Sequence, residues 1–293
     1  MQYADGWQAS ARHSNRYRPS TSRKDPMSRS DIIVKEQDLT YLSWNECFSP
    51  SGLGGTRAKA REGRGCNAVY YKRSRTGALG RDNRDLVAQL VGARLADALG
   101  FEHAPFQLVR AYLYPGEQAT WVVRSKSYRK AGERAVSIED YLELCGDPRE
   151  TPLEFFARRG WGEQAAQTLF FDYLTATRDR DASCFEVLLD AGGSARLSPL
   201  ALRSMSLANA FPLDSWRRDP CADIASASFL TLGSQSDNLA YVARILGVVP
   251  KPHSLKKTLL GNLSEAVDDP SFLEGCFEIV NERWDAYARI CNL

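Results

Sequence analysis

The sequence lacks the features that most readily assign a chain to a class of protein. Its seven cysteines contain no C-x-x-C pair, and its three histidines lie far apart along the 293 residues. Neither a disulfide framework nor a zinc site is indicated. No apolar run approaches the ~18 residues that a membrane span requires, and the N-terminus has no hydrophobic stretch typical of a secretion signal. We therefore expect a soluble protein of the reducing cytoplasm that does not contact membranes.

The chain as a whole also lacks a large excess of either positive or negative charge. The 38 basic and 36 acidic side chains leave a net charge of +2, so the molecule has no general field that would attract nucleic acid. Residues 1–30 are the exception, with six basic residues against two aspartates and few apolar side chains. We predict a disordered basic tail there, which is either a nucleic-acid-binding arm or a solvated extension upstream of a start at Met27.

The composition is that of a folded, enzyme-sized protein. Hydrophobic residues make up 43% of the chain and charged residues 25%, and the length suits one large domain or two small ones. Alternation predicts a strand over 67–72, and apolar residues three and four apart predict an amphipathic helix over 82–99. Strands over 106–114 and 119–124 should form a hairpin through Pro115-Gly116.

The second half of the chain is expected to be mainly helical. Ser137 opens one helix with a capping signature, and further helices are predicted over 151–158, 162–175, 237–246 and 271–290. This order of elements predicts an α+β protein with a β-rich N-lobe over residues 31–130 and a mainly helical C-lobe over 131–293. The boundary is placed at 125–135, where basic residues and a glycine interrupt the apolar pattern.

Several short motifs follow one another in an order that carries more information than any of them alone. They are Tyr70-Tyr71-Lys72, Leu99-Gly-Phe-Glu-His103, Thr120-Trp-Val122, Tyr173-Leu with Asp179-Arg180, and Pro199-Leu200. From about Ser49 to Leu207 the chain resembles the HipA-like kinase family, specifically its shorter single-chain relatives. The resemblance implies a protein-kinase-like fold of two lobes and an origin related to toxin–antitoxin systems.

The resemblance also implies roles for particular residues. Lys72 would contact the nucleotide, and Asp179, followed by Arg180, would accept the proton of a substrate hydroxyl. The phosphate loop would be the glycine-rich stretch before Lys59, in which the nucleotide-binding positions are Ser51, Gly52, Gly55 and Thr56. Taken without the resemblance, a glycine-rich segment between strands is more often an ordinary turn, and a strand lysine is more often solvated.

The metal-binding positions depart from the family pattern. The family's Asp-Arg-His-x-x-Asn is replaced by Asp179-Arg-Asp-Ala-Ser-Cys184, and the aspartate that should follow Pro-Leu falls on Leu202. Leucine has no lone pair for Mg²⁺, and a cysteine sulfur is too soft for this hard cation. On our alignment Gln89 stands where a helix glutamate should pair with the lysine, or Asp85 if the register shifts. We predict no bound metal at these positions.

These departures leave three interpretations open. The first is a pseudokinase that binds an unidentified protein partner as a regulatory module, with Asp179 and Arg180 vestigial as an ion pair and Cys184 a packing residue. The second is an active serine/threonine kinase that uses ATP and Mg²⁺, with oxygen ligands supplied by Asp181, Ser183 or Glu186. The third is a DNA-associated regulator, which would contact nucleic acid indirectly or through the basic tail.

Overall fold

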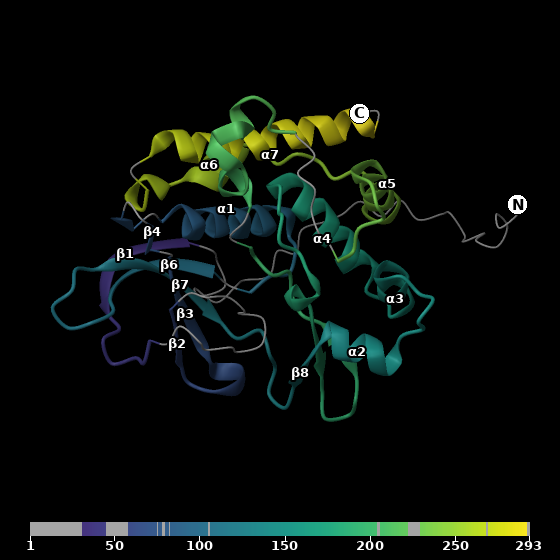
Figure 1. Ribbon diagram of the computed structural model, residues 1–293, viewed down its shortest axis with the longest axis horizontal. Coiled ribbons are helices and arrows are strands. Elements are labelled where there is room, and N and C mark those ends of the chain that lie inside the picture. The colour runs from purple at the N-terminus through teal and green to yellow at the C-terminus, as the bar shows by residue number, and fades with distance from the viewer. Residues whose placement is uncertain are drawn as a thin grey trace, which may run out of the picture.

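The first half of the chain folds into a five-stranded sheet, and the second half is mainly helical (Figure 1). The computed structural model describes most of the chain. The described residues are 31–44, 58–74, 76–77, 80–81, 83–104, 106–203, 206–221, 229–267 and 269–291. The predicted basic tail, residues 1–30, lies outside these ranges. None of the described helices is both long and apolar enough to span a bilayer.

The first half of the chain is mainly strands, with helix α1 between β5 and β6, and the second half is mainly helical. The strands are β1 (Asp31–Asp38), β2 (Lys59–Glu62), β3 (Val69–Arg73), β4 (Thr76–Gly77), β5 (Gly80–Arg81), β6 (Phe106–Tyr112), β7 (Thr120–Lys126), β8 (Arg134–Ser137), β9 (Glu186–Leu189) and β10 (Ala195–Leu197). The helices are α1 (Arg84–Leu99), α2 (Ile138–Cys145), α3 (Pro152–Arg158), α4 (Gly162–Thr175), α5 (Gln235–Leu246), α6 (Leu255–Leu260) and α7 (Pro270–Ile290).

The large sheet has the strand order β1-β6-β7-β3-β2. Strands β6, β7, β3 and β2 are antiparallel neighbours, whereas β1 runs parallel to β6. The turn between β6 and β7 contains Gly116 at a φ of +79°, a conformation that glycine adopts at no steric cost. The predicted hairpin through Pro115-Gly116 is therefore confirmed. A separate three-stranded sheet, β10-β9-β8, is formed by strands that follow the large sheet in the chain.

Helix α1 lies between the large sheet and helices α6 and α7 (Figure 1). The helix predicted over 82–99 is confirmed, and Gly100 ends it at a φ of +69°. Its burial is more complete than an amphipathic pattern predicts, because every residue from Asp85 to Ala96 is buried. The sheet covers one side of the helix and the C-terminal helices cover the other, so its polar residues Asp85, Gln89 and Arg94 are enclosed as well.

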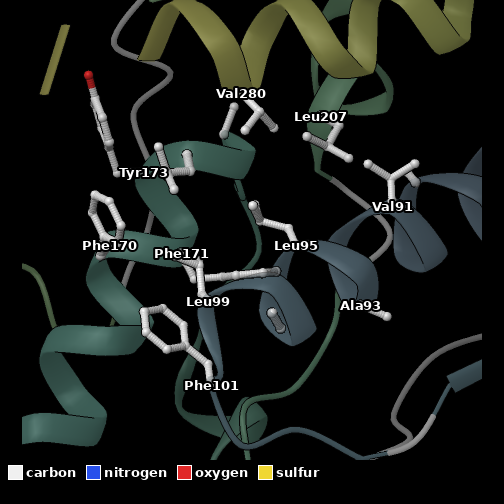
Figure 2. Close-up of a cluster of buried hydrophobic side chains, with 14 of the residues drawn as sticks. Val91, Ala93, Leu95, Leu99, Phe101, Phe170, Phe171, Tyr173, Leu207 and Val280 are labelled. Atoms are coloured by element: carbon white, nitrogen blue, oxygen red, sulfur yellow. The ribbon is translucent and has the colours of Figure 1, made fainter. Parts of the chain in front are cut away.

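The main hydrophobic core joins the two halves of the chain. Figure 2 shows α1 side chains, including Val91, Leu95 and Leu99, near the α4 residues Phe170 and Phe171. Val280 of α7 and Leu207 close the same cluster, which is almost inaccessible to solvent. A second, smaller cluster covers the other face of the sheet and includes Tyr71, Val109 and Val122. Because the first cluster spans α1, α4 and α7, the two halves of the protein fold around one shared core.

The predicted helices of the second half are also confirmed, with starts that differ by one or two residues at most. Ser137 caps α2 by accepting a hydrogen bond from the Asp140 backbone at 3.0 Å, as its capping signature predicts. Thr151 and Glu154 form a reciprocal capping box at the start of α3. These local signals are independent of tertiary packing, which explains why the sequence located the helices well.

Helix α7 packs against the 3-10 helix Pro212–Arg217, and the closest approach is at Gly275. A β-carbon built at this buried position would lie 2.4 Å from the Trp216 ring. We expect Gly275→Ala to lower the free energy of unfolding by about 1–3 kcal/mol through overpacking. The gain in helix propensity, about 1 kcal/mol, would otherwise raise stability. Urea unfolding measures the difference.

Gly162→Ala is the matched control for this prediction. A β-carbon at Gly162 would come no closer than 3.4 Å to any atom, the nearest being the Tyr241 hydroxyl. This variant should retain wild-type stability within about 1 kcal/mol. Equal stability of the two variants would contradict the close contact between Gly275 and Trp216.

Candidate functional site

The segment that follows α4 carries the predicted catalytic pair Asp179 and Arg180. Helix α4 ends at Thr175, and the chain continues to a short 3-10 turn at Ala182–Cys184 and then to β9. We call residues 176–184 the catalytic-loop segment, after the role that the resemblance implies. Asp179 and Arg180 are adjacent in sequence but have different partners.

Arg180 is a buried structural anchor. Its guanidinium is 1% exposed and binds both carboxylate oxygens of Asp172, with the shortest nitrogen–oxygen distance at 2.7 Å. Its third donor bonds the Ala201 carbonyl at 2.7 Å, and its own carbonyl accepts from the Phe229 backbone. Arg180 thus ties the catalytic-loop segment to α4 and to the residues that precede Leu202. Sequence reasoning missed Asp172, although a charged residue inside a predicted apolar helix was the available signal.

Asp179 pairs with Arg203. One carboxylate oxygen, Oδ2, accepts a hydrogen bond from Arg203 at 3.1 Å, and the two side chains are 30% and 22% exposed. The other oxygen, Oδ1, is buried and has no hydrogen-bond partner among the residues that the structure describes. The sequence interpretation of Asp179 and Arg180 as one ion pair with each other is therefore replaced by two separate pairs. Arg203 was not singled out from the sequence.

The side chain of Cys184 contacts other residues of its own loop. Its sulfur lies 3.3 Å from the Asp179 carbonyl oxygen and 3.4 Å from Asp181 Oδ1. Burial raises the pKa of the Cys184 thiol to about 11, so at neutral pH it is a protonated donor. Burial would raise the pKa of Asp181, but hydrogen bonds from Ser183 and Cys184 lower it overall. The thiol is in the state least suited to binding a metal.

Leu202 packs toward helix α1. A β-carbon built at Gly92 would lie 4.0 Å from the Leu202 side chain and 3.3 Å from the Phe171 ring. Leu202 is partly buried against the main core. Among the described residues, no group of three or more His, Cys, Asp or Glu side chains could hold a metal ion. The donor set around Cys184 and Leu202 does not fit the Mg²⁺ that kinase chemistry uses.

Lys72 lies on β3 and faces α1. Its ammonium is 3.4 Å from the side-chain oxygen of Gln89, whereas Asp85 accepts a 2.6 Å hydrogen bond from Ser74. The structure thus brings Lys72 to Gln89, the position favoured by the sequence alignment, and an uncharged amide stands where a carboxylate was expected. Lys59, 2% exposed, is directly opposite Lys72 on the neighbouring strand, so both lysines lie on the same face.

The predicted phosphate-loop residues Ser51, Gly52, Gly55 and Thr56 lie outside the described residues. Arg180 and Cys184 both line a small pocket, whose other walls include Gln164 and Thr168 of α4. Asp179 is not among the residues that line it. The side chains of the catalytic-loop segment thus divide between two environments.

The oxygen donors that the sequence offered as replacement ligands are engaged elsewhere. The Ser183 hydroxyl donates to Asp181, and Glu186 accepts a hydrogen bond from the Tyr128 hydroxyl. Glu186 is 5% exposed and lies on β9. Tyr128 belongs to residues 127–133, the linker between β7 and β8, and burial raises its pKa.

A second contact anchors the same linker. Arg196 of β10 binds both carboxylate oxygens of Glu133, at 2.7 and 2.8 Å, and also bonds the Tyr128 carbonyl at 2.9 Å. Hydrogen bonding to Arg196 lowers the pKa of Glu133 to about 2. The β9–β10 hairpin therefore holds the linker that connects the two sheets. None of these residues had been singled out as an anchor from the sequence.

One structural comparison supports a kinase-like fold. The chain is similar to the crystal structure of a proinflammatory kinase, CtkA, of Helicobacter pylori, with a TM-score of 0.57 and 14% sequence identity over 87% of this chain and 97% of that one. The crystal structure of the Golgi casein kinase matches with a TM-score of 0.43 and 9% identity, over 87% of this chain and 73% of that one. No family model matches the chain, and no curated protein sequence matches it.

The chain therefore has an α+β, protein-kinase-like fold of two lobes. The sequence prediction of this fold class is confirmed. At 14% identity the likeness establishes the fold and not the chemistry.

Because of the Arg180–Asp172 pair, we expect substitutions at Arg180 and at its neighbour Asp179 to have very different effects on stability. Arg180→Met leaves the Asp172 carboxylate buried without its partner, and we expect a loss of about 3–5 kcal/mol in the free energy of unfolding. The double variant Arg180→Met with Asp172→Leu should regain most of this loss, because no buried charge remains. Asp179→Asn is the matched control and should change stability by no more than about 1 kcal/mol, since its ion pair is partly exposed. Similar losses for Arg180→Met and Asp179→Asn would contradict the assignment.

The stabilisation that Glu133 of the linker provides should depend on pH. A carboxylate whose pKa is lowered on folding stabilises the protein above its unfolded pKa, and that stabilisation is lost as pH falls toward the folded pKa. We expect Glu133→Gln to cost about 1 kcal/mol at pH 7. The difference from wild type should shrink as pH falls from about 4.5 toward 2. Glu143→Gln, on the exposed part of α2, is the control, and a pH-independent difference for Glu133→Gln would contradict the prediction.

Proposed function

We propose that this protein is a HipA-like pseudokinase, a kinase-fold module that acts by binding a partner protein and makes weak or no use of nucleotide. One observation carries the proposal. At the two positions where the resemblance places metal ligands, Cys184 is bonded within its own loop and Leu202 packs toward α1. Phosphoryl transfer depends on metal ions that neutralise the triphosphate, so loss of both ligands removes the largest source of that neutralisation.

The retained parts of the site support a role in folding. Arg180, which the resemblance places beside the catalytic carboxylate, forms a buried pair with Asp172 and bonds the Ala201 carbonyl. A site that has lost its chemistry would retain such a pair, because removing either partner strands a buried charge. We infer that the protein is cytoplasmic and that any contact with nucleic acid is indirect or through residues 1–30.

The alternative is an active, ATP-dependent serine/threonine kinase with displaced metal ligands. It is favoured by Asp179 Oδ1, a buried oxygen without a hydrogen-bond partner among the described residues, which could accept a proton. Lys72 and Arg180 are also present at the positions that the resemblance assigns to them. The three candidate replacement ligands are the weakness of this alternative, because each has another contact in the structure.

Transfer of labelled phosphate from ATP separates the two functions. The full-length chain is incubated with labelled ATP and a general protein substrate in Mg²⁺ or in Mn²⁺. We expect no transfer above background with either cation, because Cys184 and Leu202 offer neither of them a hard ligand. Transfer that is abolished by Asp179→Asn and by Lys72→Ala would establish the active kinase instead.

A further inference from the structure

Two buried polar atoms at the predicted catalytic position, one of Asp179 and one of Arg203, have no hydrogen-bond partner among the described residues. The Arg203 guanidinium contacts Asp179 through one nitrogen only, at 3.1 Å. Arg203 Nε and Asp179 Oδ1 are both buried, and neither has a hydrogen-bond partner among the residues that the structure describes. Buried polar atoms are rarely left in this state, because each loses its hydrogen bonds to water without replacement. The arrangement leaves one donor and one acceptor available to a ligand.

Arg203 directly follows Leu202, the residue at one of the two positions that the resemblance assigns to metal ligands. Its backbone adjoins Leu202, whose side chain lies 4.0 Å from a β-carbon built at Gly92 of α1. Gly92 is three residues after Gln89, so the two share a face of α1, and Gln89 contacts the Lys72 ammonium at 3.4 Å. Leu202 and Lys72 therefore both lie next to the same face of α1, and Arg203 adjoins Leu202.

Basic side chains lie near this position together with the carboxylates of Asp179 and Asp181. Arg180 is neutralised by its buried pair with Asp172, but Arg203 shares Asp179 through a single, partly exposed contact. Lys59 and Lys72 are cross-strand neighbours on the sheet face that looks toward α1. A guanidinium stays charged at every physiological pH and matches phosphate oxygens with two parallel donors.

We propose that Arg203 supplies the positive charge that a kinase takes from its divalent cation, so that this site binds the triphosphate of a nucleotide without metal. The proposal rests on the proposed function, in which phosphoryl transfer is lost, and adds to it that nucleotide binding is retained. On binding, the Arg203 guanidinium turns from Asp179 toward phosphate oxygens through its unpartnered Nε–H. Arg203 is a binding residue here, and no bond of the nucleotide is made or broken.

The test is the affinity of the full chain for ATP, measured by calorimetry with excess EDTA and again with Mg²⁺. We expect the dissociation constant in EDTA to lie within about twofold of that in Mg²⁺, or below it. Arg203→Met should weaken binding in EDTA by about tenfold or more, the usual effect of a lost charged hydrogen bond. Arg203→Lys keeps the charge without the fork and should fall between the two.

The ratio of the two dissociation constants distinguishes charge neutralisation from a general loss of structure. Mg²⁺ cancels part of the triphosphate charge, so Arg203→Met should weaken binding of free ATP more than binding of the Mg²⁺ complex. A variant that had only lost its fold would weaken both equally, and thermal unfolding checks for this directly. Arg110→Met removes the β6 arginine of an exposed ion pair with Glu36 of β1 and is the matched control, with no change expected.

The outcomes separate this inference from the proposed function. ATP binding that requires Mg²⁺, binding that Arg203→Met leaves unchanged, or no ATP binding in either condition would each overturn the role of Arg203. None of these results bears on the absence of phosphate transfer. Conversely, label transfer in Mg²⁺ overturns the proposed pseudokinase, whatever the affinity in EDTA.

Discussion

The buried pair between Arg180 and Asp172 is the constraint on which the candidate site depends. It joins the catalytic-loop segment to the middle of α4, and the same guanidinium holds the carbonyl of Ala201. The segment that ends in Leu202 and Arg203 is therefore positioned by a residue that the resemblance would place in catalysis. Because a buried charge is costly without its partner, this anchor is retained whether or not the site performs chemistry. A residue that matches a catalytic motif can thus have a structural role, which its contacts reveal.

In the proposed function, the site differs from that of a working kinase in the source of its positive charge. The positions that the resemblance assigns to hard oxygen ligands hold Cys184 and Leu202, and both side chains pack locally. Arg203 occupies the next position and contacts Asp179. The uncharged Gln89 stands opposite Lys72, where a carboxylate would normally hold the lysine. On our proposal, each of these differences favours direct binding of an anion over binding of a cation.

The local elements were predictable because their signals are local. The α1 periodicity, the Ser137 cap and the Pro115-Gly116 turn depend on residues within a few positions of one another, and the structure contains all three. The complete burial of α1 was not predictable, because it depends on a sheet and on two helices from the far end of the chain. The linker anchors Glu133 and Arg196 were missed for the same reason, since they are 63 residues apart.

The sequence by itself determined the order of strands and helices, the α+β class and the absence of oxygen ligands at Cys184 and Leu202, because these follow from residue type and spacing alone. The tertiary structure decided which charges are paired. Arg180 pairs with Asp172 and Asp179 pairs with Arg203, although their order in the sequence suggested that Asp179 and Arg180 pair with each other. Adjacent side chains on an extended loop point in different directions, so their partners are set by the elements that surround the loop and not by their position in the chain.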